Sequence, residues 1–215
     1  MEFQDLGLID YEKALALQES LVEQRFKKEI KDQILFCSHN PVVTLGRSTQ
    51  PEDISGWQGP VFEVRRGGRA TYHGPNQLII YPIISLDQKF KTLRPKDIMH
   101  FLTSFEKSVL DSLFEIGFEN ITLKEDVAFD SEGRKLLNRG LWCQGKKVAA
   151  FGIAVRRWVT YHGCAINLYK DPQAFQGIQP CGYKTSDVGS LEEIQKFEEH
   201  EVVRLLKTNI QKYLV

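Results

Sequence analysis

The 215-residue chain is long enough to form one domain around a substantial hydrophobic core. Hydrophobic residues make up 42% of the chain and charged residues 26%, which excludes a disordered polypeptide. Its 28 lysine and arginine residues balance 28 acidic residues, so no net charge directs the chain as a whole toward nucleic acid or a membrane surface.

The hydrophobic pattern predicts strands in two groups, each followed by helix. In chain order, we expect a helix over 11–30 with Asp10 as its N-cap, strands over 33–37, 42–45, 61–65, 70–73 and 78–85, a helix over 95–118, strands over 137–143, 148–155 and 158–167, and a helix over 198–214. This order predicts an α+β fold, a single domain with a mixed β-sheet and packed helices.

The first eight residues carry two acidic side chains and no basic one, and no long apolar stretch follows. We therefore expect neither a targeting segment nor a membrane span, and a cytoplasmic protein. The four cysteines, Cys37, Cys143, Cys164 and Cys181, form no paired framework, which argues against disulfides. Cys37 and Cys143 lie in apolar runs and are expected to be packing residues. Cys181 differs because it stands between a proline and a glycine, outside any apolar run.

The densest cluster of glycine and polar residues is RRGGRATYHGPNQLIIYP, residues 65–82. Gly67 and Gly68 permit left-handed backbone and close approach to a ligand. The segment has neither the G-x-G-x-x-G fingerprint of dinucleotide-binding folds nor the ending of a phosphate-binding loop. A hairpin turn with two flexible glycines is one interpretation. The number of polar side chains between Arg66 and Gln77 favours a ligand site instead.

Two histidines, His73 and His162, each follow a tyrosine and precede a glycine. Each is a candidate general base, metal ligand or hydrogen-bonded structural residue. Two histidines without a third ligand make a weak zinc site, so we expect no metal and no cofactor.

Lys146 and Lys147 precede a run of small residues, AAFG, that leaves space beside the predicted strand. An ammonium beside a cysteine stabilises the thiolate and lowers the pKa of the thiol. Lys147 and Cys181 are 34 residues apart, and this spacing does not show that they meet.

Four blocks together resemble one known family. The blocks are SHNPVVTLGR, RGGRATYHGPNQLIIYP, GKKVAAFGIAVRRWVTYHGCAINL and QPCGY, and the resemblance extends over roughly residues 35–190. Their order and spacing are similar to those of the lipoyl(octanoyl) transferases, which attach octanoyl groups to proteins during lipoate synthesis. The resemblance implies a fold shared with biotin and lipoate protein ligases, with residues 1–215 forming one octanoyltransferase catalytic domain.

The resemblance also implies a cysteine–lysine dyad. Cys181 of the PCGY block corresponds to the residue that takes the acyl chain as a thioester. Lys147, just before the V-A-A-x-G strand, corresponds to the residue that lowers the thiol pKa and shuttles protons. The substrate-binding segments fall on Arg66, Gly67, Gly68, Arg69, Ala70, Thr71, Tyr72, His73, Ala150, Phe151, Gly152, Gly163, Cys164 and Ala165.

Two residues depart from the family pattern. Asn76 stands where the family usually has glycine, and asparagine is the non-glycine residue that best tolerates left-handed backbone. Cys164 replaces a bulkier aliphatic residue, which puts the preferred length of the acyl chain in question.

The partners implied are octanoyl-acyl carrier protein as donor and lipoyl-domain proteins as acceptors, such as the E2 subunits of 2-oxoacid dehydrogenases and the glycine cleavage H protein. Neither nucleic acid nor a membrane is expected as a partner. Five arginines are expected to face the acidic carrier: Arg65, Arg66, Arg69, Arg156 and Arg157.

Three alternatives stay open at this point. An ATP-dependent lipoate or biotin protein ligase of the same fold would need a nucleotide site and no catalytic cysteine. A non-catalytic acyl-protein binder would need neither Cys181 nor Lys147. A cysteine hydrolase with His73 or His162 as its base would release the free acid.

Overall fold

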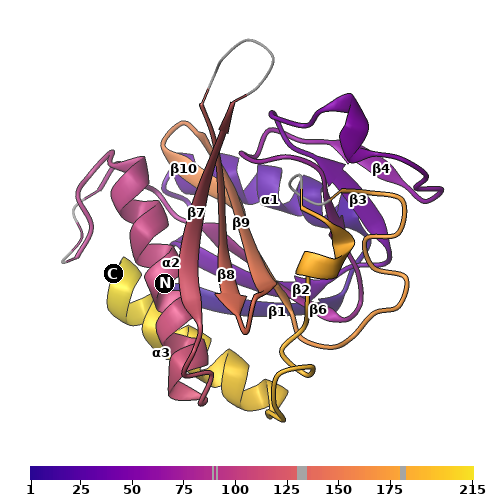
Figure 1. The fold of residues 1–215 in the computed structure, drawn as a ribbon. Helices are drawn as coiled ribbons and strands as arrows, with labels where there is room; N and C mark the ends of the chain where they lie inside the picture. Colours follow the sequence, from indigo (N-terminus) through magenta and orange to yellow (C-terminus); the bar gives the residue numbers. More distant parts are fainter. Residues whose placement is uncertain (89, 91, 130–134, 180–182) are drawn as a thin grey trace.

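A seven-stranded mixed sheet forms the centre of the computed structural model (Figure 1). The structure describes residues 1–88, 90, 92–129, 135–179 and 183–215, with only the backbone at 126, 128, 129 and 135–137. The strand order is β1-β2-β6-β10-β9-β8-β7, in which β1 runs parallel to β2 and the other neighbours are antiparallel. The strands are β1 Glu2–Leu8, β2 Gln33–Ser38, β6 Gln77–Ile83, β7 Thr122–Phe129, β8 Lys135–Cys143, β9 Lys146–Arg156 and β10 Val159–Asn167.

A smaller sheet has the order β4-β3-β5, with β3 at Val42–Leu45, β4 at Val61–Glu63 and β5 at Thr71–His73. The short 3-10 helix η1, Pro51–Asp53, lies in the connection between β3 and β4. A second one, η3, Thr185–Asp187, lies between β10 and the C-terminal helix. Strand β5 leads into β6 after a turn of three residues, so the polar segment 65–82 joins the two sheets.

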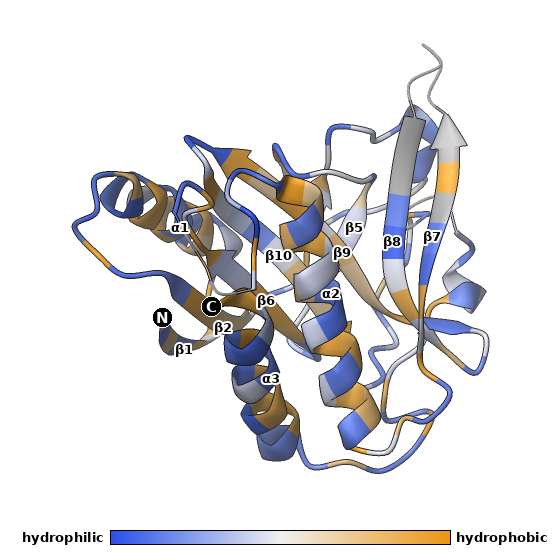
Figure 2. Cartoon of the chain, turned by 90° about the vertical axis from the view of Figure 1, so that its left-hand side faces the viewer, coloured by the Kyte–Doolittle hydropathy of each residue, from blue (hydrophilic) through white to orange (hydrophobic). Residues whose placement is uncertain are grey.

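Helices cover both faces of the large sheet. Helices α2, Ile98–Glu115, and α3, Glu199–Leu214, pack together over one face, as Figure 2 shows. Helix α1, Tyr11–Phe26, lies against β6 and β10 on the opposite face. Each face has its own apolar core, and the buried Cys143 and Cys37 belong to these two cores. The prediction that both cysteines are packing residues is confirmed.

The α+β architecture with a mixed sheet is also confirmed, with shifts at helix ends. Helix α1 stops at Phe26 because Lys28 adopts left-handed backbone, with φ of 63°. Helix α2 begins at Ile98, where the Asp97 side chain accepts a hydrogen bond from the His100 amide at 2.9 Å. Gly117, with φ of 111°, follows its end. None of the described helices has the length and apolar character needed to cross a membrane.

Strands β1 and β7 were not predicted. Both lie at an edge of the large sheet, and their sequences, EFQDLGL and TLKEDVAF, carry many charged or polar side chains. Edge strands keep one side toward solvent and therefore lose the apolar alternation on which the prediction depends.

Helix α2 offers a matched test of the larger core. Phe105 is fully buried, stacked on Phe101 and in edge contact with Phe151, whereas Phe114 on the same helix is 56% exposed. Phe105→Ala should lower the free energy of unfolding by about 3–5 kcal/mol, because it removes buried surface and leaves a cavity. Phe114→Ala should change it by less than about 1 kcal/mol. Urea denaturation measures both values, and equal losses would contradict the packing described.

Candidate active site

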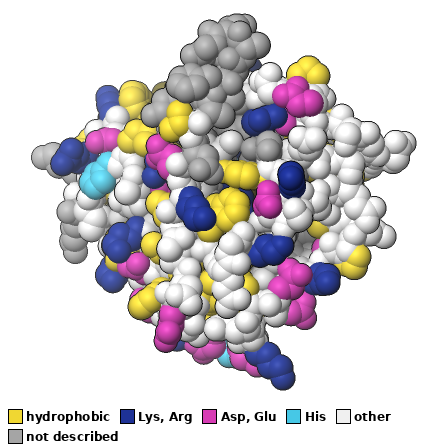
Figure 3. All heavy atoms as spheres, viewed as in Figure 1, with side chains coloured by type: hydrophobic (Ala, Val, Ile, Leu, Met, Phe, Trp, Pro, Cys, Tyr) yellow, Lys and Arg dark blue, Asp and Glu magenta, His cyan; other side chains and the backbone are white. Residues whose placement is uncertain are grey.

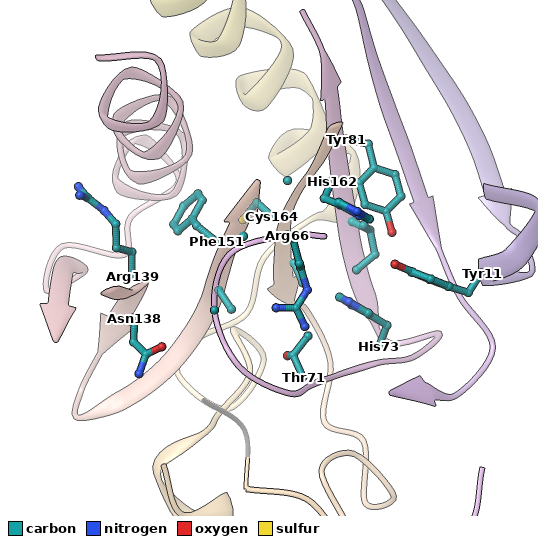
Figure 4. Close-up of a pocket in the computed structure, with 16 residues that line it drawn as sticks. Tyr11, Arg66, Thr71, His73, Tyr81, Asn138, Arg139, Phe151, His162 and Cys164 are labelled. Carbon is teal, nitrogen blue, oxygen red and sulfur yellow. The ribbon is translucent and has the colours of Figure 1, made fainter. Parts of the chain in front are cut away.

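Three adjoining hollows follow the β9–β10 ribbon on the face that α1 and the smaller sheet cover. The inner cavity receives residues from α1, β5, β6, β8, β9 and β10 (Figure 4). A middle cavity shares Thr71, Ala150 and Ala165 with it. An outer cleft shares Gln77, Asn167, Phe175 and Val188 with the middle cavity. The three hollows therefore follow one another along the ribbon, and we call this series the path.

Small residues in facing pairs create this path. Across the β9–β10 ladder, Ala150 pairs with Ala165 and Gly152 pairs with Gly163. A Cβ atom on Gly163 would lie 2.0 Å from the Ile80 carbonyl oxygen, and one on Gly152 would lie 3.1 Å from Arg66 Cδ. Any larger side chain at these two positions would displace backbone or fill the space beside Arg66.

The loop before β5 is fixed by the buried guanidinium of Arg66. It donates to the Thr44 carbonyl and hydroxyl oxygens, both at 2.8 Å, and to the carbonyl oxygens of Gly67 and Arg69 at 3.0 and 2.9 Å. The Gly67 amide in turn donates to the Ile153 carbonyl of β9 at 3.1 Å. The polar segment is therefore more than a flexible turn: its arginine fixes the loop to the smaller sheet, and its Gly67 amide binds the large sheet.

Most of the sequence-predicted substrate-binding residues line the inner cavity: Arg66, Gly68, Thr71, His73, Ala150, Phe151, Gly152, Gly163, Cys164 and Ala165. Tyr72 faces the outer cleft instead and donates a hydrogen bond from its hydroxyl to Asp171 at 2.7 Å. Gly67, Arg69 and Ala70 lie in the same loop but outside the lining of the three hollows.

Lys147 lines the middle cavity and is only 5% exposed. A β-bulge places it there, because β8 and β9 shift register between Leu141 and Trp142 and leave Val148 as the extra residue. Gly140 on β8 makes the room, since a Cβ atom at that position would lie 2.4 Å from Lys147 Cε. Lys146, the neighbouring lysine, points the other way and binds the Ser186 carbonyl at the surface.

The ammonium of Lys147 lies 4.7 Å from the centre of the Tyr183 ring, and that ring is in edge contact with Trp142. Among the described residues, no carboxylate lies within ion-pair distance of Lys147. A buried cation over an aromatic face is stabilised by the ring's quadrupole. Cys181, the predicted nucleophile, lies outside the described residues, as do Pro180 and Gly182.

The three described cysteines are free and buried. Burial raises the pKa of Cys37 to about 12, and it also raises the pKa values of Cys143 and of Cys164, the latter well above its usual range. None of these three thiols is therefore an effective nucleophile at neutral pH.

His73 and His162 both line the inner cavity, and burial lowers the pKa of each, that of His162 to about 3. Both nitrogens of His73 have protein partners, with Nδ1 3.3 Å from Gln77 Oε1 and Nε2 3.4 Å from Thr44 Oγ1. In the part of the chain that the structure describes, no three His, Cys, Asp or Glu side chains form a metal-binding group.

Sequence reasoning missed several residues of the site. Tyr11 and Tyr81 line the inner cavity although each lies in an element whose apolar pattern indicates core. Arg139 of β8 also lines it and holds the buried Glu106 of α2 through two hydrogen bonds of 2.6 and 2.7 Å. Gly140 carries no motif, so only its contact with Lys147 reveals its role.

The expectation that five arginines face a partner is wrong for Arg66, which is 7% exposed and bonded inside. Arg69 turns inward to form an ion pair with the fully buried Asp53, and Arg156 and Arg157 both bind Glu23. Arg65 remains exposed. Where Figure 3 colours side chains, basic and acidic groups alternate and no patch of one sign gathers on that face.

Comparison with known proteins agrees with this geometry. A family model described as the lipoyl protein ligase A/B catalytic domain matches residues 10–211. The octanoyltransferase of Bdellovibrio bacteriovorus is 42% identical over 192 residues, which cover 89% of this chain and 88% of that protein. The octanoyltransferase of Pelobacter propionicus is 34% identical over 196 residues, with coverages of 90% and 85%.

Two solved structures are similar in fold alone. The bi-partite lipoate protein ligase of Thermoplasma acidophilum aligns with a TM-score of 0.64 at 16% identity, over 99% of this chain and 83% of that one. Biotin protein ligase from Aquifex aeolicus aligns with a TM-score of 0.51 at 13% identity, over 100% and 69% of the two chains. The predicted fold relationship is confirmed.

The neutral His162 makes folding sensitive to acid. Its pKa is about 3 in the folded chain and near 6.5 in the unfolded chain, so only the unfolded state gains a proton as the pH falls from 6.5 toward 3. Between pH 7.5 and 5.0 this should cost about 2 kcal/mol of stability. Urea denaturation at pH 7.5 and 5.0 measures the free energy of unfolding, and its decrease between these two pH values should be about 2 kcal/mol smaller in His162→Asn than in the unmodified protein. Equal decreases in the variant and the unmodified protein would contradict the assignment.

Proposed function

We propose that this protein transfers an octanoyl group from acyl carrier protein to a lysine of a lipoyl domain, because the chain belongs to the lipoyl protein ligase A/B catalytic domain family and to its octanoyltransferases. The enzyme is thus an acyltransferase, and residues 1–215 act as one catalytic domain in the cytoplasm. Lipoyl chains are a second cargo of the same reaction.

The transfer has two covalent steps. The Cys181 thiolate attacks the carbonyl carbon of the thioester on the carrier. A new carbon–sulfur bond forms, the old one breaks, and the Lys147 ammonium gives its proton to the departing sulfur, so that the carrier leaves as a thiol. The neutral amine of the acceptor lysine then attacks the Cys181 thioester and displaces the thiolate. An amide forms, and Lys147 takes the proton lost by the amine, which restores the ammonium–thiolate pair. Because the thioester already supplies the activated acyl group, no ATP is needed.

The observation that carries the proposal is the buried position of Lys147 in the wall of the middle cavity, under the Tyr183 ring. Cys181 precedes Tyr183 by two residues, and consecutive Cα atoms are about 3.8 Å apart. The contact between Tyr183 and Lys147 therefore supports a pairing of Cys181 with Lys147. The buried state of the other three thiols supports Cys181 further, because burial has made them poor nucleophiles.

The order of the three hollows supports the assignment of one part of the octanoyl donor to each hollow. The acyl chain occupies the inner cavity, whose walls include Ile79, Phe151 and Ala165. The thioester lies in the middle cavity beside Lys147. The carrier's pantetheine arm, which contains two amides, follows the outer cleft past Asn76, Gln77 and Asn167. The side chain of Asn76 donates to the Lys170 carbonyl at 3.2 Å, which stabilises the turn at the mouth of this cleft.

The acceptor is a lipoyl-domain protein, such as the E2 subunit of a 2-oxoacid dehydrogenase or the glycine cleavage H protein. The solved lipoate protein ligase of Thermoplasma acidophilum is reported together with its E2 lipoyl domain, which supports this class of acceptor for a chain of the same fold. Two bulky proteins reach one thiol in turn, since the covalent intermediate makes simultaneous binding unnecessary.

The first test of this function is acylation without ATP. Octanoyl-acyl carrier protein mixed with the enzyme should add one octanoyl mass to the intact protein, and an apo lipoyl domain should then remove it. Cys181→Ser should abolish the adduct, while Cys143→Ser should keep it because Cys143 is a packing residue. Intact-mass spectrometry measures all three. Acylation that occurs only with ATP and free octanoate would contradict the transferase mechanism and favour the ATP-dependent ligase.

The adjacent lysines provide a matched test of the dyad. Lys147→Ala should raise the pH at which half of the Cys181 thiol reacts with iodoacetamide by about 1–3 units, because a nearby ammonium stabilises the thiolate. Lys146→Ala should leave that pH unchanged, since Lys146 is exposed and bound to the Ser186 carbonyl. The dyad assignment fails if the two variants give the same alkylation profile.

A further inference from the structure

The chain just before Cys181 is bound to the loop between β3 and β4. Three backbone hydrogen bonds, of 2.8, 2.9 and 3.0 Å, join residues 53–56 to residues 177–179. In the shortest of them, the Gln179 amide donates to the Asp53 carbonyl oxygen. An antiparallel bridge pairs the two segments between these bonds. We call this contact the clamp, and it ends two residues before Cys181.

Close packing makes the clamp rigid. Phe175 and Ile178 are buried in an apolar cluster with residues of the smaller sheet, and Figure 1 shows the segment that follows β10 beside that sheet. Gly177 lies at the closest approach, where a Cβ atom would be 2.4 Å from backbone atoms of Gly56 and Trp57. Its φ of 74° is also left-handed. Any side chain at Gly177 would therefore open the clamp.

The side chain of Asp53 connects the clamp to the loop before β5. This carboxylate is fully buried, and the Arg69 guanidinium binds both of its oxygens, with Nε donating to Oδ2 at 3.0 Å and Nη2 donating to Oδ1. The Arg69 carbonyl oxygen accepts in turn from the Arg66 guanidinium at 2.9 Å. Because Arg66 lines the inner cavity, a series of hydrogen bonds runs from the wall of that cavity to the clamp.

The chain after Cys181 has its own anchor, on β9. The Tyr183 ring lies over the Lys147 ammonium, and the Gly189 amide donates to the Lys147 carbonyl oxygen at 3.1 Å. Gln179 and Tyr183 are each two residues from Cys181, and two residues of extended chain span at most about 7 Å. The clamp and the Tyr183 contact therefore restrict, from both sides, the short stretch of chain that carries the thiol.

The structure gives Arg69 a different place from the one its sequence context predicts. The resemblance assigns it to substrate binding, but it lines none of the three hollows. Its side chain is 14% exposed and binds Asp53, with the exposed Glu52 as a second partner at 3.4 Å. A guanidinium that holds both oxygens of a carboxylate fixes the orientation of the two groups as well as their distance. This contact therefore suits a role in placing the clamp.

We infer that Asp53 and Arg69 are positioning residues, which act through the clamp to hold the thiol of Cys181 in register with Lys147 and with the acyl chain. The inference rests on the proposed function, because it takes Cys181 as the nucleophile and the inner cavity as the acyl site. Lys147 itself is placed by β8 and β9, independently of this ion pair. Loss of the pair should therefore slow the chemical step and leave donor binding almost unchanged.

Variants of the ion pair in the full chain test the inference. Asp53→Asn and Arg69→Gln should each raise the pH at which half of the Cys181 thiol reacts with iodoacetamide by about 0.5–1 unit, since an ammonium stabilises a thiolate only when the two are held together. In single-turnover acylation by octanoyl-acyl carrier protein, the maximal rate should fall about ten- to hundredfold, and the donor concentration that gives half of it should change less than about twofold. Arg69→Lys, which keeps the charge without the bidentate contact, should give smaller effects.

Asp32→Asn is the matched control. The Asp32 side chain is 12% exposed and accepts from the Arg25 guanidinium at 2.6 Å and from the Ser85 amide at 2.9 Å, and among the described residues none of its hydrogen bonds reaches the clamp. Its loss should lower the melting temperature about as much as Asp53→Asn does, while the alkylation pH and the maximal acylation rate stay unchanged. Gly177→Ala, which opens the clamp and leaves the ion pair in place, should reproduce the kinetic effects of Asp53→Asn.

Three results would overturn the inference: an unchanged alkylation pH and acylation rate in the two ion-pair variants, the same unchanged values in Gly177→Ala, or equal kinetic losses in Asp32→Asn, which would indicate a general effect of lower stability. Gly177→Ala and Arg69→Lys decide the matter if Asp53→Asn does not fold. Failure of the proposed function gives another pattern, an octanoyl adduct that survives Cys181→Ser or forms only with ATP. The alkylation comparison needs no acyl donor and tests the clamp in either case.

Discussion

The buried guanidinium of Arg66 is the contact on which the site depends. It closes four hydrogen bonds to oxygen atoms of β3 and of its own loop, and its side chain covers Gly152 of β9. Arg66 and Gly152 both line the inner cavity, and the neighbouring Gly67 amide donates to the Ile153 carbonyl of β9, so the loop that this cation fixes also connects the two sheets beside the cavity. Removing a buried charge of this kind leaves several carbonyl oxygens without donors, which is costly in a water-free interior.

The sheet provides both the space of the site and the position of its lysine. Facing glycine and alanine pairs on β9 and β10 leave room along the ribbon. The bulge at Val148 and the contact with Gly140 then place one lysine at the middle of that path. Sites on such rigid elements hold their groups more accurately than sites on loops.

Much of this arrangement could be predicted from the sequence, and the failures have physical causes. The apolar stripe of α2 and the polar density of 65–82 were informative because burial and ligand binding impose strong composition. Strands β1 and β7 were missed because edge strands need no apolar alternation. The burial of Arg66 was missed because its partners are backbone carbonyls, which no sequence pattern records. The sequence indicates that Tyr11 and Tyr81 are core residues, because a tyrosine that lines a cavity and one that packs in a core occupy the same inward-facing positions of a helix or strand.

The alternation of the two lysines at the start of β9 has a consequence for how the chain tolerates error. Lys146 and Lys147 are consecutive strand residues, so one faces outward and the other inward. If β9 slipped by one position against β8, every side chain on it would change faces. A slip in one direction would bring Lys146 to the inward position, and the middle cavity would still receive a basic side chain; a slip in the other direction would bring Val148 there. The doubled lysine thus keeps a basic group at this position through one of the two possible slips, even though the packing of AAFG would be lost.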